Sequence, residues 1–341
     1  MDKTKELENC NSVRAFLMLC IVLYHSMALY SVGGWSPFSP AEDAPYLGII
    51  AEWLNSFHIY AFTLVSGYVF YYMRIEKGRY ADYLPFVANK AKRLLVPYVF
   101  MCTIWVAPVY CYFYGTAGVV SKFVLGVNPG QLWYLLMLFW VFVLFWTISK
   151  FADKHPFVGT VIVCLFYFAG WLLFKVDVIP NLYMFKTALM YVLFFYIGFL
   201  LRKYKWDWLY RIPSVIYLAV DLALFATNQL ISDYSGLFWS AMRFGVSALL
   251  HIVGAVMAFV ILQRISEHCG RSKAISFFSK HSMAIYLVHQ QLIYFSIGWF
   301  NGVIPPLALA LVNFAFSLGI SSLFACLMSK TRVTRFLIGS K

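Results

Sequence analysis

Long, continuous apolar stretches alternate with short polar segments along almost the whole chain. Two of these stretches read SVRAFLMLCIVLYHSMALYSV and PPLALALVNFAFSLGISSLFACLM. An apolar run of about 18 residues or more can cross a hydrocarbon core about 30 Å thick. Spanning strands would instead alternate in polarity over about 10 residues, and a helix satisfies its own backbone in lipid, so we predict an all-α membrane protein. Ten transmembrane helices are predicted, at about residues 12–32, 48–73, 94–116, 131–149, 156–175, 187–202, 213–231, 238–263, 281–299 and 304–328.

The composition excludes a water-soluble fold. Of the 341 residues, 62% are hydrophobic and 12% are charged, whereas soluble domains have about 45–50% and about 25%. The net charge of +13 does not indicate nucleic-acid binding, because the basic residues lie in short segments between the spans. The seven cysteines are scattered without a CxxC pair, so neither a disulfide framework nor a metal site is predicted. Residues 1–341 are expected to form one transmembrane domain that begins with an uncleaved span.

The positions of Lys and Arg predict that both ends of the chain lie in the cytoplasm, because cytoplasmic loops carry the excess of basic residues. All but four of the 27 basic residues then fall in cytoplasmic segments, and a miscounted span would destroy this pattern. The four exceptions are Lys122, Lys175, Lys186 and Arg243. The basic segment at about 74–93 is predicted to be an amphipathic cytoplasmic helix. It either binds anionic lipid headgroups or contacts the phosphates of a nucleotide-like donor.

Ionisable residues inside spans are functional candidates, because each costs roughly 2.5–3.5 kcal/mol to insert. Arg14 and His25 share one face of the first span, about 16 Å apart along the axis. An arginine at the membrane surface suits phosphates, and a deeper histidine suits general-base chemistry on a hydroxyl group. The distance between Arg14 and His25 corresponds to the length of the pantetheine arm of a CoA thioester. The alternative is that Arg14 is a positive-inside anchor and His25 a packing residue.

The second predicted span adds further candidates at a similar depth. Glu52 is placed to orient an imidazole and to stabilise its charged form. His58 is either a second base or a partner in a hydrogen bond between helices. Ser66 and Gly67 allow a close approach of two backbones or a break in the helix.

Six segments resemble, in order, the motifs of the membrane acyltransferase-3 family. SVRAFLMLCIVLYHS carries the Arg and His of its opening motif, and SFHIYAFTLVSGYVF is similar to its second span. The other four are NKAKRLLVPYVF, QLWYLLMLFW, FFYIGFLL and SMAIYLVHQQLIYF. The resemblance covers nearly the whole chain. The sequence departs from the family pattern at Ile59-Tyr60-Ala61, where a proline is common.

The resemblance implies a bacterial enzyme of the inner or plasma membrane that modifies surface glycans. Such proteins move an acetyl or similar acyl group from cytoplasmic acyl-CoA, used as a co-substrate, to a sugar hydroxyl. The glycan acceptor is lipid-linked or exported, so polysaccharide synthesis or export machinery is an expected partner besides the lipid bilayer. Two rival classes are a secondary transporter or exporter, which also keeps charges in its spans, and a glycan polymerase.

With this resemblance, roles can be assigned to individual residues. The expected catalytic residues are His25 as base, Glu52 and His58. The expected donor-binding residues are Arg14, Arg74, Lys90, Arg93, Ser66 and Gly67. The candidate acceptor-binding residues are Trp133, Tyr134, Arg243 and His289. For these four, the alternatives are interfacial anchoring of the two aromatic rings, snorkelling of Arg243 or its pairing with Asp221, and, for His289, lining of the donor tunnel or a hydrogen bond between helices.

Overall fold

The computed structural model describes residues 3–31, 36–177, 179–269 and 272–340, and over these residues the protein is a bundle of helices without a β-strand. Val32, the predicted end of the first span, and the basic residues Arg271 and Lys341 lie outside the described residues. The helices are α1 (Lys3–Met27), α2 (Pro45–Asn55), α3 (His58–Tyr71), α4 (Tyr83–Met101), α5 (Ala107–Tyr114), α6 (Trp133–Lys154), α7 (Pro156–Val176), α8 (Phe185–Tyr204), α9 (Ser214–Leu230), α10 (Leu237–Cys269), α11 (Lys273–Phe300), α12 (Pro306–Met328) and α13 (Arg332–Leu337).

The helical, multi-pass character predicted from the sequence is confirmed. Among the described residues, seven stretches are long and apolar enough to cross a membrane. They are 9–30, 83–114, 130–154, 156–176, 182–204, 237–268 and 306–328. The other three predicted spans coincide with α2 together with α3, with α9, and with α11. The count of ten crossings and the orientation of the two ends stay predictions.

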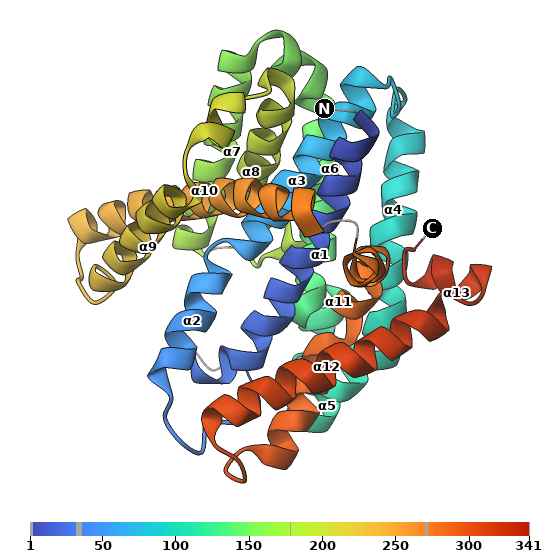
Figure 1. The fold of residues 1–341 in the computed structure, drawn as a ribbon, viewed down its shortest axis with the longest axis vertical. Coiled ribbons are helices and arrows are strands. Elements are labelled where there is room, and N and C mark those ends of the chain that lie inside the picture. The colour runs from blue at the N-terminus through green and yellow to red at the C-terminus, as the bar shows by residue number, and fades with distance from the viewer. Residues whose placement is uncertain (1–2, 32–35, 178, 270–271, 341) are drawn as a thin grey trace.

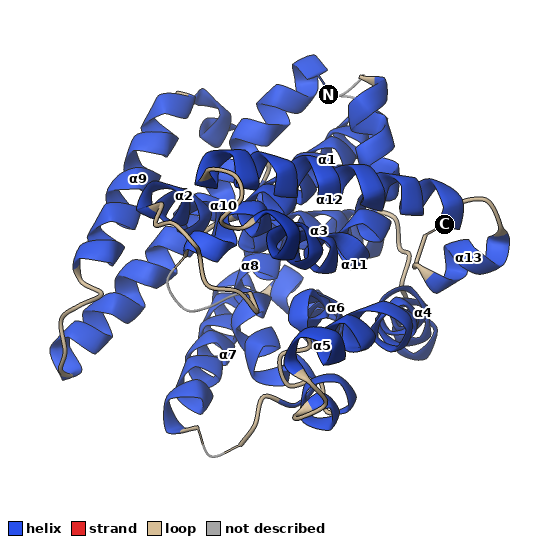
Figure 2. Cartoon of the chain, turned by 90° about the horizontal axis from the view of Figure 1, so that it is seen from below, coloured by secondary structure: helices blue, strands red, loops and turns tan. Residues whose placement is uncertain are grey.

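Helices α1, α3, α6 and α8 form the centre of the bundle, and α10 crosses them at a steep angle (Figure 1). Helices α9 and α13 lie at opposite edges, as a second view also shows (Figure 2).

Helices α3 and α8 pack with their backbones in contact, which two glycines permit. A Cβ atom on Gly67 would lie 1.8 Å from the carbonyl oxygen of Phe195, and one on Gly198 would lie 1.9 Å from that of Leu64. Small residues at helix crossings are typical of membrane proteins.

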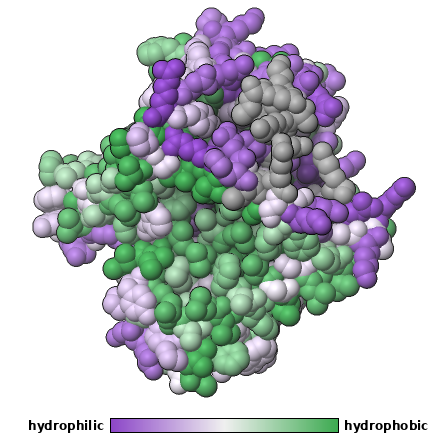
Figure 3. Space-filling model, viewed as in Figure 1, coloured by the Kyte–Doolittle hydropathy of each residue, from purple (hydrophilic) through white to green (hydrophobic). Residues whose placement is uncertain are grey.

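The surface of the bundle is divided between polar and apolar regions. On the face shown in Figure 3, polar residues gather around the N-terminal end and around α13, and apolar residues cover much of the middle and the lower part. Several large apolar side chains on α7, α9 and α12 are exposed, such as Phe157, Val215 and Leu311. Lipid contact accounts for this exposure, because the hydrocarbon core has no water to penalise it.

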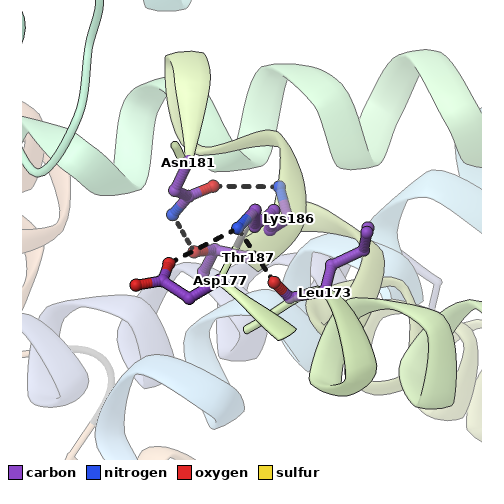
Figure 4. Close-up of polar contacts among 5 residues, drawn as sticks. All are labelled: Leu173, Asp177, Asn181, Lys186 and Thr187. Atoms are coloured by element: carbon purple, nitrogen blue, oxygen red, sulfur yellow. Dashed lines mark hydrogen bonds and ion pairs between the residues drawn. The ribbon is translucent and has the colours of Figure 1, made fainter. Parts of the chain in front are cut away.

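A buried lysine ties the end of α7 to the start of α8 (Figure 4). The Nζ atom of Lys186 donates to the carbonyl oxygen of Leu173 at 2.9 Å and lies 4.0 Å from Asp177 Oδ1. Asn181 caps α8 by accepting from the backbone N–H of Lys186 at 2.9 Å and by donating to Thr187 Oγ1 at 2.8 Å. These contacts satisfy backbone groups that a helix leaves unpaired at its ends. Lys186, one of the four basic residues outside the predicted cytoplasmic segments, therefore has a structural role.

Candidate active site

Two adjoining cavities occupy the interior of the bundle. The larger one, the histidine chamber, has a volume of about 700 Å³, and the smaller one, the arginine chamber, has a volume of about 210 Å³. The histidine chamber is lined by His25, His58, Lys122, Gln131, Trp133 and Gln290, among others. The arginine chamber is lined by Arg14, Ser66, Lys90, Arg93, Tyr134 and Phe142, among others. Ile21 and Tyr286 line both chambers, so the two cavities meet at these side chains.

Helix α1 connects the chambers because it passes along both of them. Arg14 lies in the arginine chamber, Ile21 lies at the junction, and His25 lies in the histidine chamber. The arginine chamber is therefore nearer the N-terminal end of α1. The residues that line it include three cations and no carboxylate among the described side chains, so the chamber suits a ligand with negative charge.

His25 forms a hydrogen bond with a second histidine on α11. The Nε2 atom of His289 lies 3.1 Å from the Nδ1 atom of His25, and the Nδ1 atom of His289 lies 2.7 Å from the carbonyl oxygen of Tyr286. A carbonyl only accepts, so His289 carries its proton on Nδ1 and its Nε2 is an acceptor. His25 Nδ1 then donates to His289 and to the carbonyl oxygen of Ile21, which is 2.9 Å away. This tautomer leaves Nε2 of His25 as the basic nitrogen.

His58 and His25 both lie beside the Tyr24 ring. The centroid of this ring is 4.6 Å from that of His25 and 5.2 Å from that of His58. His58 Nδ1 donates to the carbonyl oxygen of Leu54 at 2.6 Å, so its Nε2 is also the basic nitrogen. The break between α2 and α3 at residues 56–57 places His58 in the first turn of α3, and this break occurs without a proline among residues 54–61.

Glu52 lies on α2, and its carboxylate accepts a hydrogen bond from Gln229 Nε2 of α9 at 2.5 Å. It is not among the residues that line the histidine chamber. The side-chain partner that the structure places at Nδ1 of His25 is His289, which the sequence had suggested as an acceptor-binding residue, a tunnel-lining residue or a partner in a hydrogen bond between helices. The structure thus brings His25, His58 and His289 together, with Glu52 directed toward α9.

Four of the six predicted donor-binding residues share the arginine chamber, and two lie elsewhere. Arg14, Ser66, Lys90 and Arg93 line the chamber. Arg74 instead donates from Nε to Ser149 Oγ at 2.8 Å, also bonds the carbonyl oxygen of Tyr80, and stacks 3.9 Å above the Trp146 ring. These contacts make Arg74 a link between the π-helical turn Tyr72–Glu76 and α6. Gly67 lies at the contact of α3 with α8.

The predicted acceptor-binding residues also separate into different places. Trp133 lines the histidine chamber, whereas Tyr134 lines the arginine chamber and places its hydroxyl 3.4 Å from Thr63 Oγ1. Arg243 donates to the carbonyl oxygen of Tyr234 at 2.6 Å and lines neither chamber. Asp221, its suggested partner, accepts a hydrogen bond from Trp53 at 2.8 Å instead.

Several chamber residues were not identified from the sequence. Gln131 donates to the carbonyl oxygen of Leu287 at 3.0 Å and exchanges hydrogen bonds with Gln291, and the hydroxyl of Tyr286 donates to the backbone carbonyl of Gln131. Neighbouring glutamines inside a predicted span were the available signal, because an unpaired amide is costly in lipid. Lys122, on the connection between α5 and α6, also lines the histidine chamber, and burial lowers its pKa.

No group of three or more His, Cys, Asp or Glu side chains has an arrangement that holds a metal ion, among the residues that the structure describes. The polar groups of the chambers are instead suited to hydrogen bonding and proton transfer. Two imidazoles, together with amides and phenols, surround one chamber, and cations surround the other.

Comparison with known proteins identifies the family. A family model described as an acyltransferase domain, that of the acyltransferase-3 family, matches residues 8–328. This range runs from α1 to the end of α12 and includes every residue that lines the two chambers. No curated protein and no solved structure gives a match to this chain.

Proposed function

This chain belongs to the membrane acyltransferase-3 family, and we propose that it moves an acyl group, in the simplest case acetyl, from cytoplasmic acyl-CoA to a glycan hydroxyl. The glycan is a cell-surface or lipid-linked saccharide. The observation that carries this proposal is the meeting of a cationic chamber and a histidine chamber at Ile21 and Tyr286. Two substrates that enter from opposite ends of the bundle would meet there.

The arginine chamber supports the donor part of the proposal. Acyl-CoA has phosphate groups joined to a long, thin pantetheine arm that ends in the thioester. Arg14, Lys90 and Arg93 supply charge-assisted hydrogen bonds for phosphates. The eleven residues from Arg14 to His25 span about 16 Å of helix, so an extended arm that starts at Arg14 brings the thioester through the junction of the chambers and next to His25.

The histidine chamber supports the acceptor part. Its lining combines aromatic rings such as Trp133 and Tyr191 with amides such as Gln131 and Gln290. Sugars present both apolar C–H faces, which pack on aromatic rings, and hydroxyl groups, which pair with amides. Its volume of about 700 Å³ lies within the range of about 300–1,000 Å³ that is usual for ligand sites.

In the proposed mechanism, His25 is the general base. Its Nε2 takes the proton of the acceptor hydroxyl while the oxygen attacks the thioester carbonyl carbon. The tetrahedral intermediate collapses by breaking the C–S bond, and the protonated His25 returns the proton to the CoA sulfur. The products are a sugar ester and free CoA. His289 holds His25 in the tautomer that this step requires, because its Nε2 accepts from Nδ1 of His25.

The test is CoA release by the purified protein in liposomes, with acetyl-CoA and a panel of glycan acceptors. We expect acceptor-dependent release that falls by about 10²–10⁴-fold in His25→Ala. His281→Ala is the matched control, because His281 is a buried histidine of α11 whose ring lies 3.3 Å from Ser329 Oγ and lines neither chamber. CoA release that persists in His25→Ala would indicate that His58, and not His25, is the general base. Absence of CoA binding and release for every acyl-CoA would refute the proposal and favour a transporter.

A further inference from the structure

A third cavity lies on the surface of the bundle, between α4 and the C-terminal segment. We name it the tail pocket; its volume is about 430 Å³. Its lining includes Asn89, Lys92, Arg93, Phe336, Gly339 and Ser340. Arg93 also lines the arginine chamber, so the three cavities follow one another from the tail pocket through the arginine chamber to the histidine chamber.

The C-terminal wall of this pocket is held in place by specific contacts. Thr331 caps α13 by accepting from the backbone N–H of Thr334 at 3.1 Å, and Ile338 is fully buried. Gly339 has a φ of +69°, and a Cβ atom there would lie 2.6 Å from the carbonyl oxygen of Arg93. Glycine is therefore required at this position, since it permits both the left-handed backbone and the contact with α4.

The side chains of the tail pocket match a nucleotide that carries phosphates. Lys92 and Arg93 are exposed cations, and no carboxylate lines the pocket among the described residues. Phe336 leaves 47% of its surface exposed and offers a ring face on which an adenine can stack. Asn89 offers an amide that donates and accepts at the edge of such a base.

We propose that the tail pocket binds the 3′-phosphorylated adenosine of acyl-CoA. This inference rests on the proposed function. Lys92 contacts the 3′-phosphate, Phe336 stacks on the adenine, and Arg93 contacts the diphosphate at the junction with the arginine chamber. The pantetheine arm then continues past Arg14. The C-terminal segment beyond α12 is thereby part of the donor site, although it lies outside the residues that the family model matches.

The same phosphate chemistry is available in an anionic lipid headgroup, so the experiment compares the two sources. The dissociation constants of CoA, 3′-dephospho-CoA and pantetheine are measured on the full-length protein in a neutral detergent. They are measured again in vesicles of phosphatidylcholine with and without phosphatidylglycerol. The variants are Lys92→Gln and Phe336→Ala. Their controls are Lys77→Gln, a cytoplasmic-side lysine outside the three cavities, and Val333→Ala, an exposed residue of the same helix.

We expect Lys92→Gln to weaken CoA binding about tenfold and 3′-dephospho-CoA binding less than about twofold, because one charge-assisted hydrogen bond is lost only with the former. Phe336→Ala should weaken both nucleotides about equally and leave pantetheine unaffected. Equal affinities of the variants and controls for CoA would overturn the inference. So would an effect of Lys92→Gln that appears only as loss of sensitivity to phosphatidylglycerol, since the pocket would then bind lipid.

Three further outcomes separate this inference from the proposed function. Pocket variants that turn over acetyl-pantetheine at the wild-type rate have folded correctly, so their loss of CoA affinity supports the nucleotide site. A wild-type protein that neither binds CoA nor releases it from acetyl-CoA refutes the proposed function and this inference together. A wild-type protein that turns over acetyl-CoA, with tail-pocket variants that match their controls, refutes this inference alone.

Discussion

Replacement of His289 by leucine tests the role of the histidine pair most directly. Leucine is close to histidine in size but removes the acceptor that lies 3.1 Å from His25 Nδ1. The carbonyl oxygen of Ile21 remains 2.9 Å from the same nitrogen, so one hydrogen bond still stabilises the tautomer of His25 with its proton on Nδ1. Loss of a buried hydrogen bond costs about 1–3 kcal/mol. If all of this appears in the transition state, the rate falls roughly 5- to 150-fold.

This loss should be smaller than that of His25→Ala, which removes the base and about 10²–10⁴-fold of rate. It should also appear in kcat and leave the KM for acetyl-CoA nearly unchanged, because the proposed site for the donor phosphates is a separate chamber. His289→Gln should recover part of the rate, since an amide oxygen can accept from Nδ1 of His25. The assay is initial-rate CoA release in liposomes, with His281→Leu on the same helix as the control and thermal unfolding as a check on the fold.

Two results would refute this reasoning. A wild-type kcat in His289→Leu would show that the hydrogen bond does not position the base. A loss as large as that of His25→Ala, without rescue by glutamine, would show that His289 itself transfers the proton.

Two predictions concern stability rather than chemistry. Gly67→Ala should lower the free energy of unfolding by about 1–3 kcal/mol or more, because the new methyl group overlaps the Phe195 carbonyl oxygen; thermal unfolding in detergent measures this, and Gly319→Ala, where nothing lies within 4 Å, is the control. An unchanged midpoint for Gly67→Ala would contradict the backbone contact of α3 with α8. Lys186→Met should lower the free energy of unfolding by about 1–3 kcal/mol, because the Leu173 carbonyl oxygen loses its hydrogen-bond donor. The KM for acetyl-CoA should stay unchanged. An altered KM with normal stability would instead give Lys186 a role in the site.

The sequence was sufficient to predict the helices and the spacing of Arg14 and His25 along one of them. Continuous apolar runs predicted ten helical segments, and each of them coincides with a helix or a pair of helices in the structure. The family assignment from six short motifs is confirmed by the model that matches residues 8–328. The spacing of Arg14 and His25 depends only on helix geometry, so it was readable from one segment of the chain.

Partners from distant parts of the chain were not predictable in this way. His289 meets His25 across 264 positions of sequence, because α11 packs against α1. Glu52 was expected near His25 on depth alone, and in the structure its carboxylate accepts a hydrogen bond from Gln229, a residue 177 positions away in the sequence. Depth in a membrane restricts one coordinate, whereas the direction in which a side chain points depends on how the helices are rotated. The tail pocket likewise depends on the packing of Gly339 against α4.

The junction at Ile21 and Tyr286 has a consequence for the electric field across the membrane. Two adjoining cavities along α1 reduce the layer between them to the few side chains at which they meet. If the chain has the proposed orientation, most of the membrane potential would fall across this short layer. Moving one elementary charge through the whole potential is worth about 2.3 kcal/mol per 100 mV. The thioester would be cleaved at this layer, so any charge that develops on its sulfur or on His25 couples acyl transfer to the energised state of the cell.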